Sequence, residues 1–348
     1  MEKNQNTITN LIVNNIQQEQ TICDKINKSV IIVMDSCRDL GMATASILKD
    51  KVDLINHKFV KFGNNEINIC PDNSVRGKKV FIMGSGSNNN HTINDNIIAI
   101  CGIIRACRDA SAKFITVILA YYPYCRSDKK DQGRAPIMAK LMGDFFKISG
   151  ANRLITADLH SAQIQGFFDG PFDNIYAIDA FIEQIKKDYC NKNYIIISPD
   201  AGGEKRAKAW ASKLQVPCTF LTKSRDHNEI SVINNHELVH QVNFQDKLVI
   251  IVDDIGDTLG TLCSAAEIIK TKGAMEIIAV VTHGLFSNNA IAKLENSVIN
   301  KLYTTNTICH DNNMKQSIKI QIVDLSIIFS QVINCCACGG SISDLFDK

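Results

Sequence analysis

Short runs of apolar, often β-branched residues recur along the chain, and most of them end in polar residues or glycine. Eight such runs predict strands, at 30–33, 79–83, 114–120, 154–157, 194–197, 218–221, 248–252 and 277–281. Most of these runs are continuously apolar, which is typical of strands that are buried on both faces of a parallel sheet.

Segments with helical spacing of apolar residues lie between many of these strands, at 95–108, 135–148, 205–214 and 259–270. Buried strands that alternate with helices predict an α/β fold with mainly parallel sheets flanked by helices. The pattern runs twice, before and after about residue 170, and a chain of 348 residues is long enough for two domains. Ligands bind at the carboxyl ends of such strands, so the polar residues that follow each strand are the candidates for chemistry.

The composition narrows the class of protein. A net charge of +2 without a dense basic block gives no indication of a nucleic-acid surface, and no apolar run reaches the length of a membrane helix. The 13 cysteines are irregularly spaced and follow no secretory signal, which predicts reduced thiols in a cytoplasmic protein. Residues 1–28 lack the features of a signal or transit peptide, and we expect a poorly ordered extension or a short added helix.

The strongest candidate site is Val252–Thr261, where a predicted buried strand runs into two adjacent carboxylates and then into a loop and a helix. Backbone N–H groups and hydroxyls ahead of a helix N-terminus form a phosphate-binding loop. Aspartates beside a phosphate would be repulsive unless they hold ribose hydroxyls or a hydrated Mg²⁺ ion. Helix capping alone would need only one such residue.

This segment resembles the phosphoribosyl pyrophosphate loop of the type I phosphoribosyltransferase fold. Four further blocks narrow the resemblance to the ribose-phosphate pyrophosphokinase family: Ser74–Gly77, Tyr124–Asp131, Asp158–Asp169 and Ser198–Gly203. The resemblance covers almost all of 30–346. It implies two tandem phosphoribosyltransferase-like domains, at 29–176, with 330–348 packing back on it, and at 177–329.

The resemblance also implies an activity, which is transfer of the diphosphate of ATP to the anomeric hydroxyl of ribose 5-phosphate. The products would be phosphoribosyl pyrophosphate, which feeds nucleotide biosynthesis, and AMP. Fixed cations and Mg²⁺ would stabilise the charge of the transition state, and no covalent intermediate is expected. By resemblance the catalytic cations are Lys223 and Arg225.

The substrate contacts follow from the same resemblance. The sugar phosphate would be held by Asp253, Asp254, Asp257, Thr258, Gly260 and Thr261, and ATP by Phe62, Asn64, Glu66, Arg126, Ser127 and Asp131. An aromatic ring would stack on adenine while polar side chains read its edge. The family commonly has Gly at Asn65 and Gln at Ser127, so a side-chain contact from Ser127 to the nucleotide is less well supported.

His160 and Asp200 would organise Mg²⁺ on the nucleotide, and the signature segment adds Asp158, Asp169 and Asp173 as further candidate ligands. Asp173 could equally cap a helix or line an effector site. The family often has a regulatory site where phosphate activates and ADP inhibits, and here the matching residues include Ser74, Arg76, Ser341 and Ser343. The resemblance further implies a homo-oligomer of dimers assembled into hexamers.

Two other functions compete with this one. A phosphoribosyltransferase would use the product and would not need the blocks around Arg126 and His160. A non-catalytic regulatory relative should have lost catalytic cations or metal ligands, and this chain keeps Lys223, Arg225 and His160.

Overall fold

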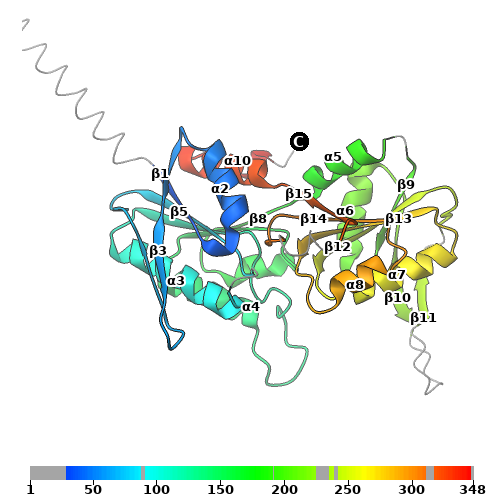
Figure 1. Cartoon of the computed structure of the whole chain (residues 1–348), viewed down its shortest axis with the longest axis horizontal. Coiled ribbons are helices and arrows are strands. Elements are labelled where there is room, and N and C mark those ends of the chain that lie inside the picture. Colours follow the sequence, from blue (N-terminus) through cyan, green and yellow to red (C-terminus); the bar gives the residue numbers. More distant parts are fainter. Residues whose placement is uncertain are drawn as a thin grey trace, which may run out of the picture.

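The computed structural model describes residues 29–87, 91–190, 192–224, 235–238, 242–310 and 317–345. The extension expected at 1–28 lies outside these residues. Two α/β units lie side by side, each built on a mainly parallel sheet with helices against it (Figure 1). The fold class predicted from the apolar runs is therefore confirmed.

The N-terminal unit contains a six-stranded parallel sheet with the order β2-β1-β5-β6-β7-β8. Its strands are β1 (Ser29–Val33), β2 (Val52–Ile55), β5 (Lys79–Gly84), β6 (Phe114–Leu119), β7 (Arg153–Ala157) and β8 (Phe172–Ile175). Its helices are α2 (Arg38–Ile47), α3 (Ile93–Asp109) and α4 (Met138–Ser149), with short 3₁₀ turns η1 (Asp35–Cys37) and η2 (Ala162–Phe167). α3 begins at a capping box between Thr92 and Asp95.

A separate antiparallel hairpin packs against α3 in this unit. It consists of β3 (His57–Lys61) and β4 (Ile67–Pro71). Figure 1 shows it on the side of the N-terminal unit that faces away from the C-terminal sheet. The residues of its tip therefore lie far from the C-terminal strands of the same chain.

The C-terminal unit contains, in the part that the structure describes, a seven-stranded sheet with the order β11-β10-β9-β12-β13-β14-β15; the β10–β11 pair is antiparallel and the other pairs are parallel. Its strands are β9 (Tyr194–Ser198), β10 (Cys218–Ser224), β11 (Asn235–Leu238), β12 (Leu248–Gly256), β13 (Glu276–Gly284), β14 (Lys301–Thr305) and β15 (Ile320–Val323). Its helices are α5 (Ile178–Asp188), η3 (Ala201–Gly203), α6 (Glu204–Leu214), α7 (Gly260–Thr271) and α8 (Ala290–Glu295).

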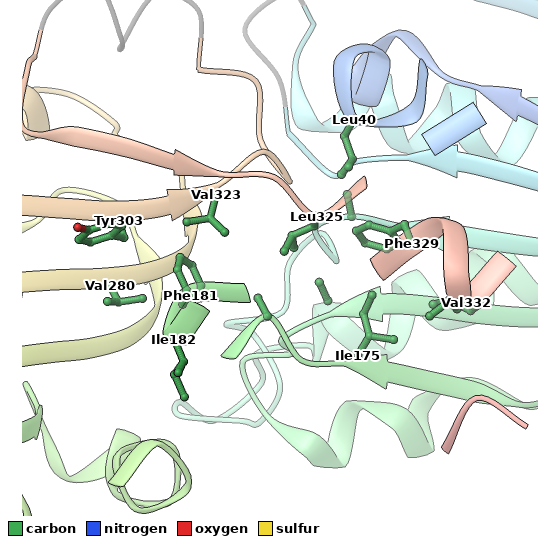
Figure 2. Close-up of a cluster of buried hydrophobic side chains, with 14 of the residues drawn as sticks. Leu40, Ile175, Phe181, Ile182, Val280, Tyr303, Val323, Leu325, Phe329 and Val332 are labelled. Atoms are coloured by element: carbon green, nitrogen blue, oxygen red, sulfur yellow. The ribbon is translucent and has the colours of Figure 1, made fainter. Parts of the chain in front are cut away.

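The chain then returns to the N-terminal unit through α10 (Ser326–Cys338), which packs against α2 and is followed by η4 (Ser343–Leu345). One buried apolar cluster runs across the boundary between the units (Figure 2). Leu40 and Phe329 contribute from the side of α2 and α10, and Phe181 and Tyr303 from the C-terminal unit. Because close-packed interiors resist rearrangement, this cluster fixes how the two sheets face each other.

A polar contact joins the end of α5 to β14 and gives stability a dependence on pH. Lys301 Nζ and Tyr303 Oη donate to the same Asp188 oxygen, at 2.8 and 2.6 Å. Burial alone would raise the pKa of Asp188, but these hydrogen bonds lower it overall. A lowered carboxyl pKa stabilises the fold above the unfolded value of about 3.9, and this stabilisation is lost as pH falls through the lower folded value.

Asp188→Asn should therefore lower the free energy of unfolding by about 1–2 kcal/mol at pH 7. The difference from the wild type should shrink toward pH 3, because protonation removes the same charge from the wild type. Urea denaturation at both pH values measures it. Asp144→Asn is the control, since that carboxylate forms an exposed ion pair with Lys140. A difference for Asp188→Asn that is the same at both pH values would contradict this explanation.

Candidate active site

The carboxyl ends of strands from both sheets meet at the boundary between the units. Asp253 and Asp254 lie near the end of β12, and His160 follows β7 of the other sheet. His160 Nδ1 lies 2.7 Å from an Asp254 oxygen, so the two sheets are in direct polar contact here. A cavity of about 380 Å³ opens beside this contact, with Asp158, Asp253 and Arg206 among its lining residues.

The two adjacent carboxylates are held by one guanidinium. Arg206 of α6 lies 3.1 Å from Asp253 and 3.0 Å from Asp254. The side chain of Asp254 is only 4% exposed, and one of its oxygens contacts Arg206 while the other contacts His160. Sequence reasoning missed Arg206, although its place just after Gly203 in the Ser198–Gly203 block was an available signal.

These contacts separate the acidities of the two aspartates. Burial and the neighbouring Asp254 carboxylate raise the pKa of Asp253. Burial would also raise the pKa of Asp254, but the contacts with His160 and Arg206 lower it. Asp254 in turn raises the pKa of His160. The ionised Asp254 therefore orients the imidazole through Nδ1, which leaves Nε2 as the ring atom to meet a ligand.

The predicted phosphate loop lies between β12 and α7. Leu259 precedes α7 in the left-handed region, with φ at 58°, and its side chain is buried at 3% exposure. The buried Leu259 side chain fixes the turn to the core, while Thr258 and Thr261 are exposed around the first N–H groups of α7. Those N–H groups lack helical partners, which favours an anion at this position.

Asp257 of this loop contacts the N-terminal unit. Arg126 Nη1 lies 2.8 Å from an Asp257 oxygen. Burial opposes ionisation of Asp257, but hydrogen bonds from Ser287 and Arg126 lower its pKa overall. The predicted ATP contact Arg126 and the predicted sugar-phosphate loop are thus brought together.

The two other predicted ATP contacts near Arg126 have different surroundings. Ser127 Oγ accepts a hydrogen bond from the Met138 amide at the start of α4. Asp131 is exposed and pairs with Lys129 at 3.5 Å. Ser127 thus has a structural contact in place of the contact expected from the family's glutamine.

The candidate metal ligands differ in their exposure and in their hydrogen-bond partners. Asp200 is exposed after β9 and accepts from the Gly203 amide, while the carboxylate of Asp158 accepts from the Ala177 amide and the Thr282 hydroxyl. Asp169 lies at the surface, 97% exposed. Among the described residues, no three His, Cys, Asp or Glu side chains are grouped closely enough to hold a metal ion alone.

Asp173 has a different partner from the other candidate metal ligands. It pairs with Arg153 at 3.4 Å, and burial raises its pKa. Its register opposite Ile155 places it within the sheet, before the carboxyl ends of β7 and β8. Asp173 is therefore set back from the edge that carries His160.

The backbone of Lys223 lies at the edge of the sheet where the site is found. β10 runs parallel to β9 with Phe220 opposite Ser198, and Lys223 lies further along β10, past the end of β9. Asp200 lies at the same edge. The side chain of Lys223 and the whole of Arg225 lie outside the described residues.

The predicted adenine contacts are not brought together with the rest of the site in one chain. Phe62, Asn64 and Glu66 form the turn between β3 and β4, where the Phe62 ring is 48% exposed. Figure 1 places this hairpin on the far side of the N-terminal unit from β12.

The predicted regulatory residues lie on two segments of the N-terminal unit. Ser74 and Arg76 are in the turn before β5, where Arg76 Nη1 lies 3.5 Å from Ser111 Oγ. Ser341 and Ser343 follow α10. Lys79 of β5 donates to the Ala337 carbonyl, which brings the two segments to the same end of the unit.

Sequence reasoning also missed a buried histidine. His283 near the end of β13 is 1% exposed, and burial lowers its pKa to about 4. Its Nε2–H donates across the boundary to the Ala157 carbonyl at 3.0 Å, and it lies 3.3 Å from the Asp158 carbonyl. The available signal was the Thr-His-Gly that follows the apolar run at 277–281.

Comparisons with known proteins identify the family of this chain. Residues 29–150 match the N-terminal domain of ribose phosphate pyrophosphokinase, and residues 234–347 match the phosphoribosyl synthetase-associated domain. The crystal structure of phosphoribosylpyrophosphate synthetase from Mycobacterium smegmatis is similar over 90% of this chain and 100% of that chain. The two are 31% identical, with a TM-score of 0.82.

Shorter proteins match only part of the chain. Orotate phosphoribosyltransferase from Aeropyrum pernix is 18% identical over 38% of this chain and 68% of its own, with a TM-score of 0.30. Purine phosphoribosyltransferase from Pyrococcus horikoshii is 25% identical over 32% of this chain and 74% of its own, with a TM-score of 0.26. These matches carry no argument about activity.

Within the described residues, none of the helices is long and apolar enough to cross a membrane. The two family domains match 29–150 and 234–347, and the similarity to a solved synthetase extends over 90% of the chain. The chain belongs to the ribose-phosphate pyrophosphokinase family.

Proposed function

We propose that this protein transfers the diphosphate of ATP to ribose 5-phosphate, giving phosphoribosyl pyrophosphate and AMP. The observation that carries this proposal is the joining of two predicted sites at one boundary. His160 of the N-terminal unit contacts Asp254, and Arg126 contacts Asp257 of the phosphate loop. Residues proposed to hold the nucleotide therefore face residues proposed to hold the sugar phosphate, as a direct transfer between the two ligands requires.

In the proposed reaction the anomeric hydroxyl of the sugar attacks the β-phosphorus of ATP. An O–P bond forms, the bond between the β-phosphorus and the oxygen that joins it to the α-phosphorus breaks, and AMP leaves with that oxygen. The proton of the attacking hydroxyl passes to water. Charge grows on the bridging and equatorial oxygens, and we assign its stabilisation to Lys223 and Arg225 with support from Arg126.

Mg²⁺ is the metal that suits this site. The exposed carboxylate of Asp200 and the phosphate oxygens of ATP are the hard donors that Mg²⁺ prefers, with water completing its shell. His160 can add one ring nitrogen, because Asp254 holds the other. Such a shared shell fits a set of residues that does not close around a metal alone. When bound, Mg²⁺ supplies electrostatic stabilisation of the transferred group.

We further propose a cytoplasmic homo-oligomer that uses ATP and ribose 5-phosphate and takes inorganic phosphate as an activator at Ser74, Arg76, Ser341 and Ser343. The position of Phe62, Asn64 and Glu66 on an outward hairpin supports the oligomer, since a second copy could bring such a hairpin to the site. Cys37, Cys107 and Cys125 are buried thiols, and their use in the interior supports a reducing compartment.

One assay tests the activity. Purified protein is incubated with ATP, ribose 5-phosphate, Mg²⁺ and phosphate, and AMP is measured with and without the sugar. We expect AMP that depends on the sugar and appears in equal amounts with phosphoribosyl pyrophosphate. A phosphoribosyltransferase would instead consume phosphoribosyl pyrophosphate when a nucleobase is added. A regulatory relative would form no AMP alone.

A further inference from the structure

The loop that carries His160 is held from the opposite unit. Asp158, two residues earlier, has a φ of 38°, in the left-handed region that residues with side chains rarely adopt. Such a conformation is strained and persists only where surrounding contacts determine it. The Asp158 amide donates to the Ile175 carbonyl of its own unit, and its carboxylate accepts from the Ala177 amide directly before α5.

Two consecutive residues of β13 add hydrogen bonds to this turn. Thr282 Oγ1 donates to the carboxylate at 2.7 Å. His283 Nε2 faces the carbonyl oxygens of Ala157 and Asp158 at 3.0 and 3.3 Å. A ring nitrogen between two carbonyl oxygens must carry the proton, so Nδ1 accepts.

The acceptor role of His283 Nδ1 fits its other neighbour. Thr307 Oγ1 lies 2.9 Å from Nδ1 and can donate to it. Thr305 Oγ1 donates to the Thr282 carbonyl at 2.7 Å, and Thr307 Oγ1, which also lies 2.8 Å from Thr305 Oγ1 and 3.3 Å from that carbonyl, is the hydroxyl within reach of Nδ1. Thr307 is itself tied to the N-terminal unit, because its carbonyl accepts from Ser85 Oγ at 2.9 Å. Hydrogen bonds at both ring nitrogens thus fix the orientation of the His283 side chain.

From these contacts we propose that His283 and Thr282 are positioning residues for the transfer reaction. They hold the strained turn at Asp158 and thereby set where His160 stands relative to Asp254. Neither is assigned a contact with substrate, so they act through His160. This inference rests on the proposed function for its kinetic test. We call Thr282 and His283, with their hydrogen bonds to Ala157 and Asp158, the clamp. The C-terminal unit carries the predicted sugar-phosphate loop at 257–261, so the clamp should affect catalysis more than binding of ribose 5-phosphate.

The kinetic test uses full-length variants under saturating Mg²⁺. His283→Leu should lower kcat on the order of 10²-fold, since small misplacement of a reacting group has effects of this size. The KM for ribose 5-phosphate should stay within about threefold, as expected when only positioning in the transition state is lost. His283→Gln should recover most of kcat, because its side-chain amide can donate to the same carbonyls.

A merely structural role would lower kcat and sugar binding together, or impair the Gln and Leu variants equally, and either result would overturn the proposal. An unchanged kcat in His283→Leu would do the same. If His283→Leu does not fold, Thr282→Val removes one hydroxyl from the clamp. It should lower kcat in the same direction with KM unchanged, and equal activity with the wild type would contradict the clamp.

A readout without turnover separates this inference from the proposed function. If the wild type forms no AMP, the function fails, but ¹⁵N spectra of the histidine rings still judge the clamp. The clamp predicts that Thr282→Val shifts the ring signals of His160 while those of His57, in the hairpin, keep their positions. Unchanged His160 signals would overturn the clamp whatever the activity.

Discussion

Lys223→Ala should lower kcat on the order of 10³-fold, a typical loss for a cation that stabilises phosphoryl transfer. The register of β10 places the backbone of Lys223 past the end of β9, at the edge that carries Asp200. The charge that this cation would meet develops only as AMP leaves, so ATP binding should change far less than kcat. Steady-state kinetics in both substrates, with ATP affinity from calorimetry, measure the two effects.

Lys208→Ala is the matched control for Lys223→Ala. Lys208 lies on α6 of the same unit and pairs with Glu204 on an exposed face, so its loss should leave kcat unchanged. Wild-type turnover by Lys223→Ala would remove Lys223 from the reaction. A loss confined to ATP affinity would assign it to nucleotide binding instead.

Asp254→Asn should lower kcat by about 10²-fold, which is the upper end of the range for losing a carboxylate that orients a metal-binding histidine. The amide keeps the shape of the side chain but removes the charge that contacts both His160 and Arg206. The dependence of the rate on Mg²⁺ concentration should shift to higher concentration, because the His160 ring is no longer fixed through Nδ1.

A double-mutant cycle makes this second prediction sharper. If Asp254 acts through His160, then adding Asp254→Asn to His160→Ala should cost much less than it costs in the wild type. Full additivity of the two losses would show that the contact of 2.7 Å carries no function. Asp144→Asn, on an exposed face of α4, is the control for loss of a carboxylate.

The continuous apolar runs predicted the central strands well, because strands buried on both faces need such runs. All eight of those predicted strands are present, and β12 extends beyond its run to include Asp253 and Asp254. Strands with polar residues were missed for the same reason. β8 contains Asp173 and Asn174, and β14 contains Thr304 and Thr305, whose hydroxyls are satisfied only by the tertiary structure.

The residues of the candidate site also differ in how well the sequence could predict them. The phosphate loop is local in sequence, so its residues could be found from their spacing alone. Arg206 and His283 were missed because their roles depend on partners far away in the chain, such as Asp254 and Ala157. Phe62, Asn64 and Glu66 were predicted to contact adenine by resemblance, but the hairpin that carries them lies away from β12 in the same chain, which no spacing could have indicated.

The apolar cluster that joins the two units also limits how the enzyme can move. Phe329 and Tyr303 are fully buried in one continuous apolar cluster, so a hinge motion that separates the two units would expose both side chains to water. Entry and release of reactants should therefore leave the relative orientation of the sheets unchanged. Access to the candidate site should then depend on motion of loops around it, such as the loop that carries Arg126, and not on a hinge motion of whole domains.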